Sequence, residues 1–196
     1  YYRSPANVGD PALDPERAWS AEAGADWIPA PAVRLALGGW VRRTEALIDW
    51  ARPAGAPQSE PWRTRNVRDA VFRGVEAEAS TELAGTRWTA RGAALSVRAE
   101  DADGYVSKYA LRPVVESTSL AAERALPGGL GLAARARRVR RTGEDAHLLA
   151  EARLRWTAGR TEVFLDAQNL LGEAYLDVVG QPAPGRAVTV GVRWGR

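Results

Sequence analysis

The stretch RAVTVGVRW, residues Arg186–Trp194, decides the fold because its side chains alternate without a break. One face of the expected strand carries large apolar groups, namely Val188, Val190, Val192 and Trp194. The other face carries small or polar residues, namely Ala187, Thr189, Gly191 and Arg193. Successive side chains of a strand point to opposite faces, so this strand has one apolar and one polar face. A soluble sheet can have such faces, but a transmembrane β-barrel requires them, with aromatic rings where its apolar band meets water.

The composition of the 196-residue chain excludes several classes of protein. Its net charge of +3 arises from arginines spread along the chain, so we expect no nucleic-acid partner. Cysteine is absent, which excludes disulfides and thiolate metal sites. No apolar run is long enough for a transmembrane helix. The first residues lack the pattern of a signal peptide and are typical of a loop interior, so we expect the N-terminal part of a longer protein to be missing.

Short alternating segments separated by Gly and Pro predict nine strands. Their expected ranges are 16–28, 32–50, 66–82, 86–99, 112–125, 129–140, 147–157, 160–169 and 186–195. Tight connections near Pro29, Gly85, Gly128 and Gly159 alternate with longer ones over 51–65, 100–111, 141–146 and 170–185. In an up-and-down meander, all tight turns then lie at one end and all long loops at the other. Outer-membrane barrels have this asymmetry, with short periplasmic turns and long extracellular loops.

The placement of tryptophan indicates a membrane interface. Four of the eight Trp residues end strands beside tight turns or the C-terminus, namely Trp27, Trp88, Trp156 and Trp194. We expect these lipid-interface aromatics to form a ring at one depth, as aromatic belts do at membrane surfaces. The alternative is that the four rings cap the core of a soluble sheet.

Alternation also assigns charged residues to the polar face of several strands. The expected lumen-facing charges are Glu22, Asp26, Glu76, Glu78, Arg135, Arg137, Glu151, Arg153, Asp166 and Arg193. Charges of both signs suit a water-filled or plugged lumen. The segments 86–99 and 112–125 alternate poorly, so their faces are not assigned. Nine strands do not make a complete bacterial barrel, which has an even number, so we expect the chain to be part of a larger one.

Four stretches, in order along the chain, carry a resemblance to a known family. Residues Asn7–Trp19 (NVGDPALDPERAW) resemble its N-P-x-L-x-P-E loop, and Thr44–Trp50 (TEALIDW) resembles its D-L-I-x-aromatic strand top. Arg73–Glu78 (RGVEAE) resembles its x-G-V-E-x-E strand. Gln168–Tyr175 (QNLLGEAY), followed by PGR at 184–186, resembles x-N-L-F-D-x-x-Y and the P-G-R before the last strand. Together these stretches are similar to the C-terminal part of a TonB-dependent outer-membrane receptor, such as a cobalamin or siderophore receptor.

Two positions depart from the family pattern. Leu171 stands where the motif has Phe, and Gly195 and Arg196 follow Trp194, whereas the family generally ends on the terminal aromatic. The second departure concerns the end of the chain that the barrel-assembly machinery reads.

The resemblance implies an all-β fold, an antiparallel up-and-down transmembrane β-barrel segment of about nine strands from a 22-stranded barrel. Residues 1–196 would be the C-terminal portion of the barrel domain, with the plug domain outside this chain. The implied function is active uptake across the bacterial outer membrane of a large scarce nutrient, such as a ferric siderophore or cobalamin. The implied partners are outer-membrane lipid, the nutrient ligand such as a metal chelate, the inner-membrane energy-coupling complex and the barrel-assembly machinery.

Three loop aromatics, Trp62, Tyr105 and Tyr109, are the candidate ligand contacts. Exposed rings in long loops over a rigid barrel are natural contacts for a bulky ligand, although such rings also anchor lipid or pack loop on loop. No nucleophile-elbow motif occurs, and the single histidine, His147, lacks companion ligands, so we expect no enzyme activity, no metal site and no cofactor. A passive porin-like barrel and a soluble all-β binding module are the alternatives.

Overall fold

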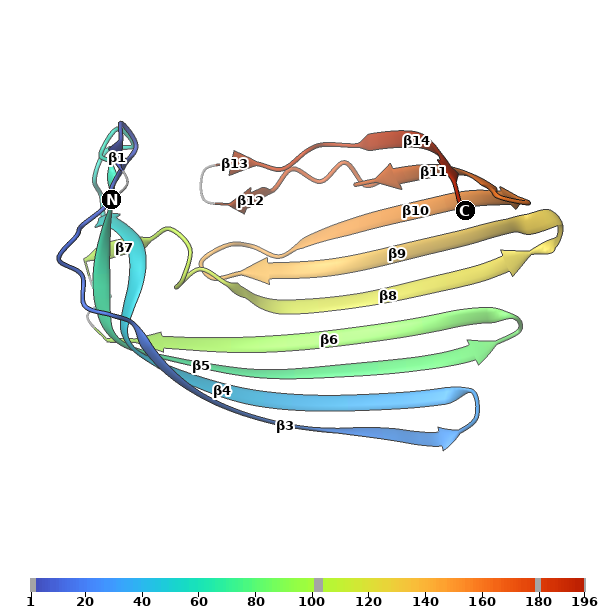
Figure 1. Ribbon diagram of the computed structural model, residues 1–196, viewed down its shortest axis with the longest axis horizontal. Coiled ribbons are helices and arrows are strands. Elements are labelled where there is room, and N and C mark those ends of the chain that lie inside the picture. Colours follow the sequence, from blue (N-terminus) through green and yellow to red (C-terminus); the bar gives the residue numbers. More distant parts are fainter. Residues whose placement is uncertain (1–2, 101–103, 179–180, 196) are drawn as a thin grey trace.

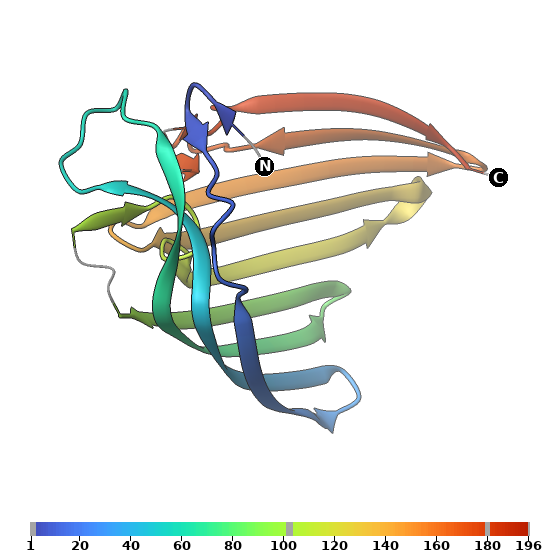
Figure 2. The same cartoon turned by 60° about the vertical axis from the view of Figure 1, so that its left-hand side comes forward.

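One antiparallel sheet carries nearly all the regular structure of the computed structural model, which describes residues 3–100, 104–178 and 181–195 (Figure 1). Its nine long strands are β3 (Arg17–Ala30), β4 (Val33–Pro53), β5 (Trp62–Leu83), β6 (Thr86–Ala99), β8 (Val114–Leu126), β9 (Leu130–Arg141), β10 (His147–Ala158), β11 (Thr161–Gln168) and β14 (Ala187–Trp194). Each pairs with the next along the chain, as an up-and-down meander does. Figure 2 shows these strands as one curved wall. The predicted all-β antiparallel fold is confirmed.

Shorter elements lie mainly in the connections, where alternation gave no signal. They are β1 (Arg3–Ser4), β2 (Asn7–Val8), β7 (Tyr105–Ser107), β12 (Leu176–Val178), β13 (Gln181–Pro182) and the 3-10 turn η1 (Pro127–Gly129). β7 adds to the outer end of β4, and β2 pairs in parallel with the start of β5. Within the described ranges, no helix is long and apolar enough to cross a membrane.

All tight connections lie at one end of the sheet, on the right of Figure 1, and the long loops lie at the other end, as predicted. Ala84 and Gly85 form the β5–β6 turn. Their φ angles of 51° and 70° place both residues in the left-handed region. The first turn differs slightly from the prediction. Pro29 lies inside β3, because this strand continues to Ala30 after a register shift beyond Trp27.

The register gives the sheet two chemically distinct faces. On one face Leu165 lies between Val190 and Leu154 on the neighbouring strands. On the other face Asp166 lies between Thr189 and Arg153. The apolar face is not packed against other described residues: Val188, Val190 and Val192 are 67%, 68% and 69% exposed. A patch of this extent needs an apolar partner.

The register also assigns the two strands whose alternation was ambiguous. Trp88 of β6 pairs with Ala122 of β8, and Ala90 pairs with Leu120. Through Ala79 and Thr81 of β5 these residues join the same apolar face. Small and hydroxylated residues hide the alternation of apolar and polar residues in these two segments. The strand pairing shows which residues share a face.

Two edges of the sheet carry no neighbour among the described residues. β3 pairs only with β4, and β14 pairs only with β11. Every residue of β3 is exposed. An unpaired edge leaves backbone N–H and C=O groups without partners, which neither water-exposed sheets nor hydrocarbon tolerate well.

Candidate functional site

The long-loop ends of β4 and β5 carry contacts that a simple up-and-down meander lacks. Ala46 has a φ of 51°, and beyond it Leu47 and Ala51 become buried. Leu47, Val67 and Ala70 form a small core at this point. Partly buried groups from the following strands and the connection before β8 pack against this core, namely Phe72, Ala99, Ala110 and Leu111. This core holds the 104–113 part of that connection against the β4–β5 hairpin.

Buried polar contacts fix the same connection more closely. The carboxylate of Asp49, only 4% exposed, accepts a hydrogen bond from the Ser107 hydroxyl and one of 2.7 Å from the Trp50 backbone N–H. Ser107 Oγ in turn accepts from the backbone N–H of Leu111 at 3.0 Å. Since buried polar groups are costly when unpaired, this network defines one position for the loop.

The loop so positioned brings cations against two of the three candidate aromatics. The Arg52 guanidinium lies 4.6 Å from the centroid of the Trp62 ring, and Lys108 Nζ lies 5.5 Å from it. Lys108 Nζ is also 5.2 Å from the Tyr109 centroid and donates a 3.0 Å hydrogen bond to Asn7 Oδ1. These distances are typical of cation–π contacts. We call Arg52, Trp62, Lys108 and Tyr109 the loop cluster.

The third candidate, Tyr105, contacts a different cation, Arg65. The Arg65 guanidinium is 3.8 Å from its ring centroid. Tyr105 is 47% exposed and Tyr109 is 51% exposed, so both rings present surface to solvent. The structure thus connects Trp62 and Tyr109 through Lys108 and leaves Tyr105 in a separate pair.

Sequence reasoning missed the cations of this region. Arg52, Arg65 and Lys108 lie outside the alternating parts of the expected strands, and nothing in their spacing indicates a shared site. The one available signal is that each lies within a few residues of a loop aromatic. Their convergence depends on the pairing of β7 with the end of β4, which no sequence pattern predicted.

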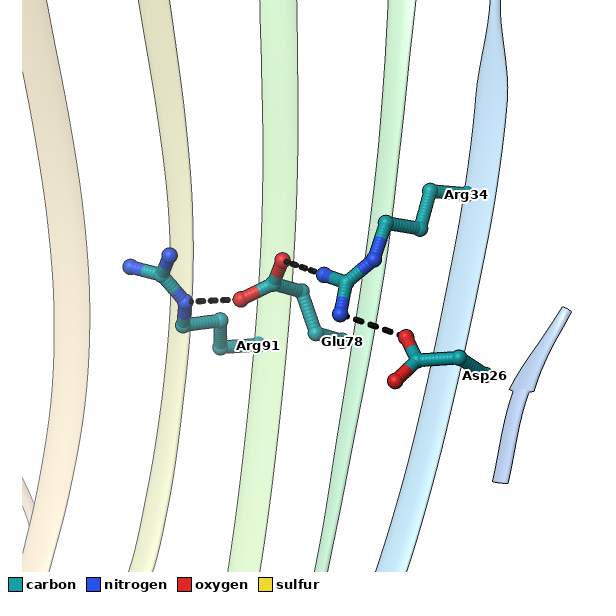
Figure 3. Close-up of polar contacts among 4 residues, drawn as sticks. All are labelled: Asp26, Arg34, Glu78 and Arg91. Carbon is teal, nitrogen blue, oxygen red and sulfur yellow. Dashed lines mark hydrogen bonds and ion pairs between the residues drawn. The ribbon is translucent and has the colours of Figure 1, made fainter. Parts of the chain in front are cut away.

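The charged residues predicted to share a face do share one, as the register shows. Figure 3 shows a ladder across β3 to β6 in which Arg34 bridges Asp26 and Glu78, and Glu78 also binds Arg91 at 2.6 Å. Further pairs are Arg135–Glu151 at 2.7 Å, Arg153–Asp166 at 3.3 Å and Arg193–Glu162 at 3.3 Å. Within the described part of the chain, Glu22, Glu76 and Arg137 form no ion pair.

These exposed pairs contribute little stability each, because solvent screens them. Their effect is instead to give the face a nearly neutral, hydrophilic lining. A cavity of about 610 Å³ lies along this face, with Asp26, Arg34, Glu78, Arg91, Arg135 and Arg137 among its lining residues.

The four predicted interface tryptophans all lie on the apolar face near the tight turns. Trp27, Trp88, Trp156 and Trp194 are 63%, 39%, 47% and 81% exposed. Trp156 Nε1 donates a 3.1 Å hydrogen bond to the Gly128 carbonyl oxygen, which ties its ring to the neighbouring turn. The Trp156 ring thus has its apolar body on the sheet face and its polar N–H toward the end of the strand.

His147 stacks on Tyr175 with ring centroids 4.3 Å apart and planes inclined by 19°. In the described ranges no group of three or more His, Cys, Asp or Glu side chains is placed to hold a metal ion. A polar side chain also braces the connection that carries Tyr175. The Asn169 amide binds the Glu173 backbone at both its N–H (2.9 Å) and its carbonyl oxygen (2.8 Å).

An open antiparallel sheet with one exposed apolar face, a charged opposite face and turns sorted by length defines the wall of an outer-membrane β-barrel. A family model described as "TonB dependent receptor-like, beta-barrel" matches residues 1–192. The chain therefore belongs to the β-barrel family of TonB-dependent receptors. These are bacterial outer-membrane receptors and transporters, not enzymes.

Solved structures share the fold at low sequence identity. The FrpB iron transporter from Neisseria meningitidis matches with a TM-score of 0.70 and 14% identity, over 96% of this chain and 32% of that one. The siderophore receptor PirA from Acinetobacter baumannii gives 0.68 and 12%, over 93% and 32%. The copper transporter OprC gives 0.73 and 14%, over 93% and 32%. The chain thus spans about a third of these proteins. No curated protein sequence matches it.

Proposed function

We propose that this chain is the C-terminal portion of the barrel wall of a receptor that imports a large metal chelate across the outer membrane. Its two open edges support this placement, because β3 and β14 need partner strands that the rest of a longer barrel would supply. The plug domain would then lie in the part of the protein outside residues 1–196.

The two faces of the sheet have different roles in this proposal. The apolar face contacts lipid, with Trp27, Trp88, Trp156 and Trp194 at the periplasmic interface. The charged face, with the ladder of Figure 3, lines the lumen against which a plug or passing ligand moves. The long loops lie outside the cell.

The loop cluster is the observation that carries the ligand assignment. It presents two cations and two aromatic rings where the ends of β4 and β5 meet the connection before β8, which the Asp49–Ser107 network holds in place. Cations attract an anionic chelate, and rings supply flat apolar contact area. The structural neighbours named above include an iron transporter and a siderophore receptor, which supports a ferric siderophore as the ligand. Cobalamin is the second candidate, on the sequence resemblance alone.

Transport in this proposal requires energy from the inner membrane. An inner-membrane complex would pull on the plug through a coupling segment outside this chain and release ligand to the periplasm. The barrel-assembly machinery would insert the wall into the membrane. This segment would supply binding surface and wall and would carry out no bond chemistry.

The ligand assignment is tested on the full-length receptor by alanine substitution of Trp62, Tyr105 and Tyr109. Binding of ferric catecholate, ferric hydroxamate and cyanocobalamin to cells is measured at matched surface abundance. A ring that contacts ligand contributes enough that its loss weakens binding about tenfold. Tyr175→Ala, which removes a loop ring stacked on His147, is the control and should leave binding unchanged. Unchanged affinity in all three variants would reject the proposal.

The passive-barrel alternative predicts a different energy dependence. Uptake of the bound chelate should stop when the inner-membrane proton gradient is collapsed, while binding at the surface persists. Uptake that continues at the same rate without the gradient would favour the porin-like alternative.

A further inference from the structure

Three arginines gather on the apolar face at its long-loop end. Arg43 of β4 and Arg98 of β6 both pair with Val71 of β5, one on each side. Arg73 lies two residues along β5, on the same face and diagonal to both. Diagonal neighbours of a sheet are about 7–8 Å apart, within reach of long side chains. We call Arg43, Arg73 and Arg98 the arginine triangle.

The depth of the arginine triangle follows from strand geometry. Arg43 lies ten residues beyond Val33, where β4 leaves its tight turn, and Arg73 lies ten residues before Leu83, where β5 enters one. Ten residues of a strand tilted by about 40° climb roughly 25 Å. This equals the height of the apolar band of such barrels, so the triangle lies where the hydrocarbon ends and the outer headgroups begin.

Among the described residues, one member of the arginine triangle forms an ion pair, and the carboxylates Glu45, Asp69 and Glu100 lie in the next row of the same face. Arg43 binds Asp69 at 2.8 Å. Arg73 and Arg98 are exposed and, among the described residues, form neither an ion pair nor a side-chain hydrogen bond. On the adjoining strands Glu116 binds both Arg138 and Arg140, which leaves a further positive charge. The patch therefore favours an anion. Phosphate suits it, because one guanidinium group can donate two parallel hydrogen bonds to two phosphate oxygens.

An apolar surface adjoins these cations. A shallow groove of about 730 Å³ crosses the strands here, and Val41, Arg73, Val75, Ala94 and Ser96 are among the residues that line it. Val41 and Ser96 are the direct partners of Arg73 on the two neighbouring strands. Apolar lining beside unpaired guanidinium groups matches an amphiphile, with its acyl chain along the sheet and its anionic head at the strand ends.

We propose that the arginine triangle binds the phosphate group of an outer-leaflet lipid. This inference rests on the proposed lipid-facing orientation of the apolar face but is independent of the transported ligand. The contact would hold the receptor at a fixed depth and would seat a specific lipid beside β4, β5 and β6.

The proposal is tested with the full-length receptor in two sets of phosphatidylcholine nanodiscs. One set contains phosphatidic acid, and the control set contains diacylglycerol with the same acyl chains but no phosphate. Native mass spectrometry measures the lipid retained by the protein. The wild type should retain phosphatidic acid and not diacylglycerol. Each arginine near an anionic lipid contributes about fivefold in affinity, so Arg73→Gln with Arg98→Gln should lower retention about 25-fold. Arg98→Gln alone should lower it about fivefold.

Arg124 provides a matched control, because it is an exposed arginine on the same face at the tight-turn end, paired in register with Leu132. Arg124→Gln should change retention less than about twofold, since a lone arginine lacks the converging geometry. Correct folding of each variant is checked by its heat-sensitive migration on gels. Retention equal to wild type in the folded double variant, or an equal loss in Arg124→Gln, would overturn the proposal.

Discussion

At the scale of single residues, glycines on the polar face make room for large rings from neighbouring strands. A Cβ at Gly74 would lie 2.5 Å from the Trp40 ring, and Gly191 is covered in the same way by Phe164. An aromatic ring that covers a cross-strand glycine supplies the packing that the glycine lacks. The sequence shows the glycines and the rings, but only the register shows that they meet.

The position of Val190 on the apolar face leads to a prediction for β14. Val190 pairs with Leu165 and Thr189 pairs with Asp166, so the two side chains point to opposite faces. An arginine on the lipid face near the bilayer midplane costs about 2–4 kcal/mol, whereas the lumen accepts it. Val190→Arg should therefore lower the free energy of unfolding of the full-length receptor in vesicles by about that amount. Thr189→Arg should hardly change it, because its side chain would lie on the charged face, beside the Arg153–Asp166 ion pair. Urea unfolding measures both, and equal losses would contradict the assignment of faces.

At the scale of elements, the alternation of tight and long connections predicts which end of each strand lies outside the cell. Gly143 lies in the loop between β9 and β10, and Gly159 lies in the tight turn between β10 and β11. An epitope tag inserted after Gly143 should bind antibody on intact cells. The same tag after Gly159 should bind only after the outer membrane is permeabilised. Antibody labelling at equal receptor abundance measures both, and staining of the Gly159 insertion on intact cells would reverse the topology.

The sequence predicted the nine long strands and their order, because alternation and turn residues are local signals. It did not predict β7 or the parallel β2–β5 contact. Those elements have two or three residues each, and tertiary contacts such as Asp49–Ser107 hold them. For the same reason the sequence indicated Trp62 and Tyr109 as separate candidates. It could not show that Lys108 lies between them.

At the scale of the whole molecule, the sheet is a wall with two open edges rather than a closed domain. Among the described residues, its buried apolar side chains lie toward the long-loop end, in the core of Leu47, Val67 and Ala70 and at Val139 and Leu149 of β9 and β10. Elsewhere a single layer of strands separates an apolar face from a charged one. Such a layer is stable only when lipid covers one face and further strands continue both edges. The proposed placement in the wall of a larger barrel would supply both the lipid and the partner strands.

The most direct test of the account is a cysteine scan across both faces of the wall, in which each variant carries one cysteine within residues 1–196, where the native sequence has none. Nitroxide labels are placed singly in the full-length receptor in vesicles. Positions on the apolar face are Ala77, Ala90, Ala122, Ala134 and Val190, and positions on the charged face are Ser80, Thr89, Ala121, Ala133 and Thr189. Collision with oxygen, which concentrates in lipid, is compared with collision with a water-soluble nickel chelate. We expect oxygen to dominate at all five apolar-face positions and at none of the charged-face positions. Equal accessibility on the two faces, or the reverse pattern, would contradict the account.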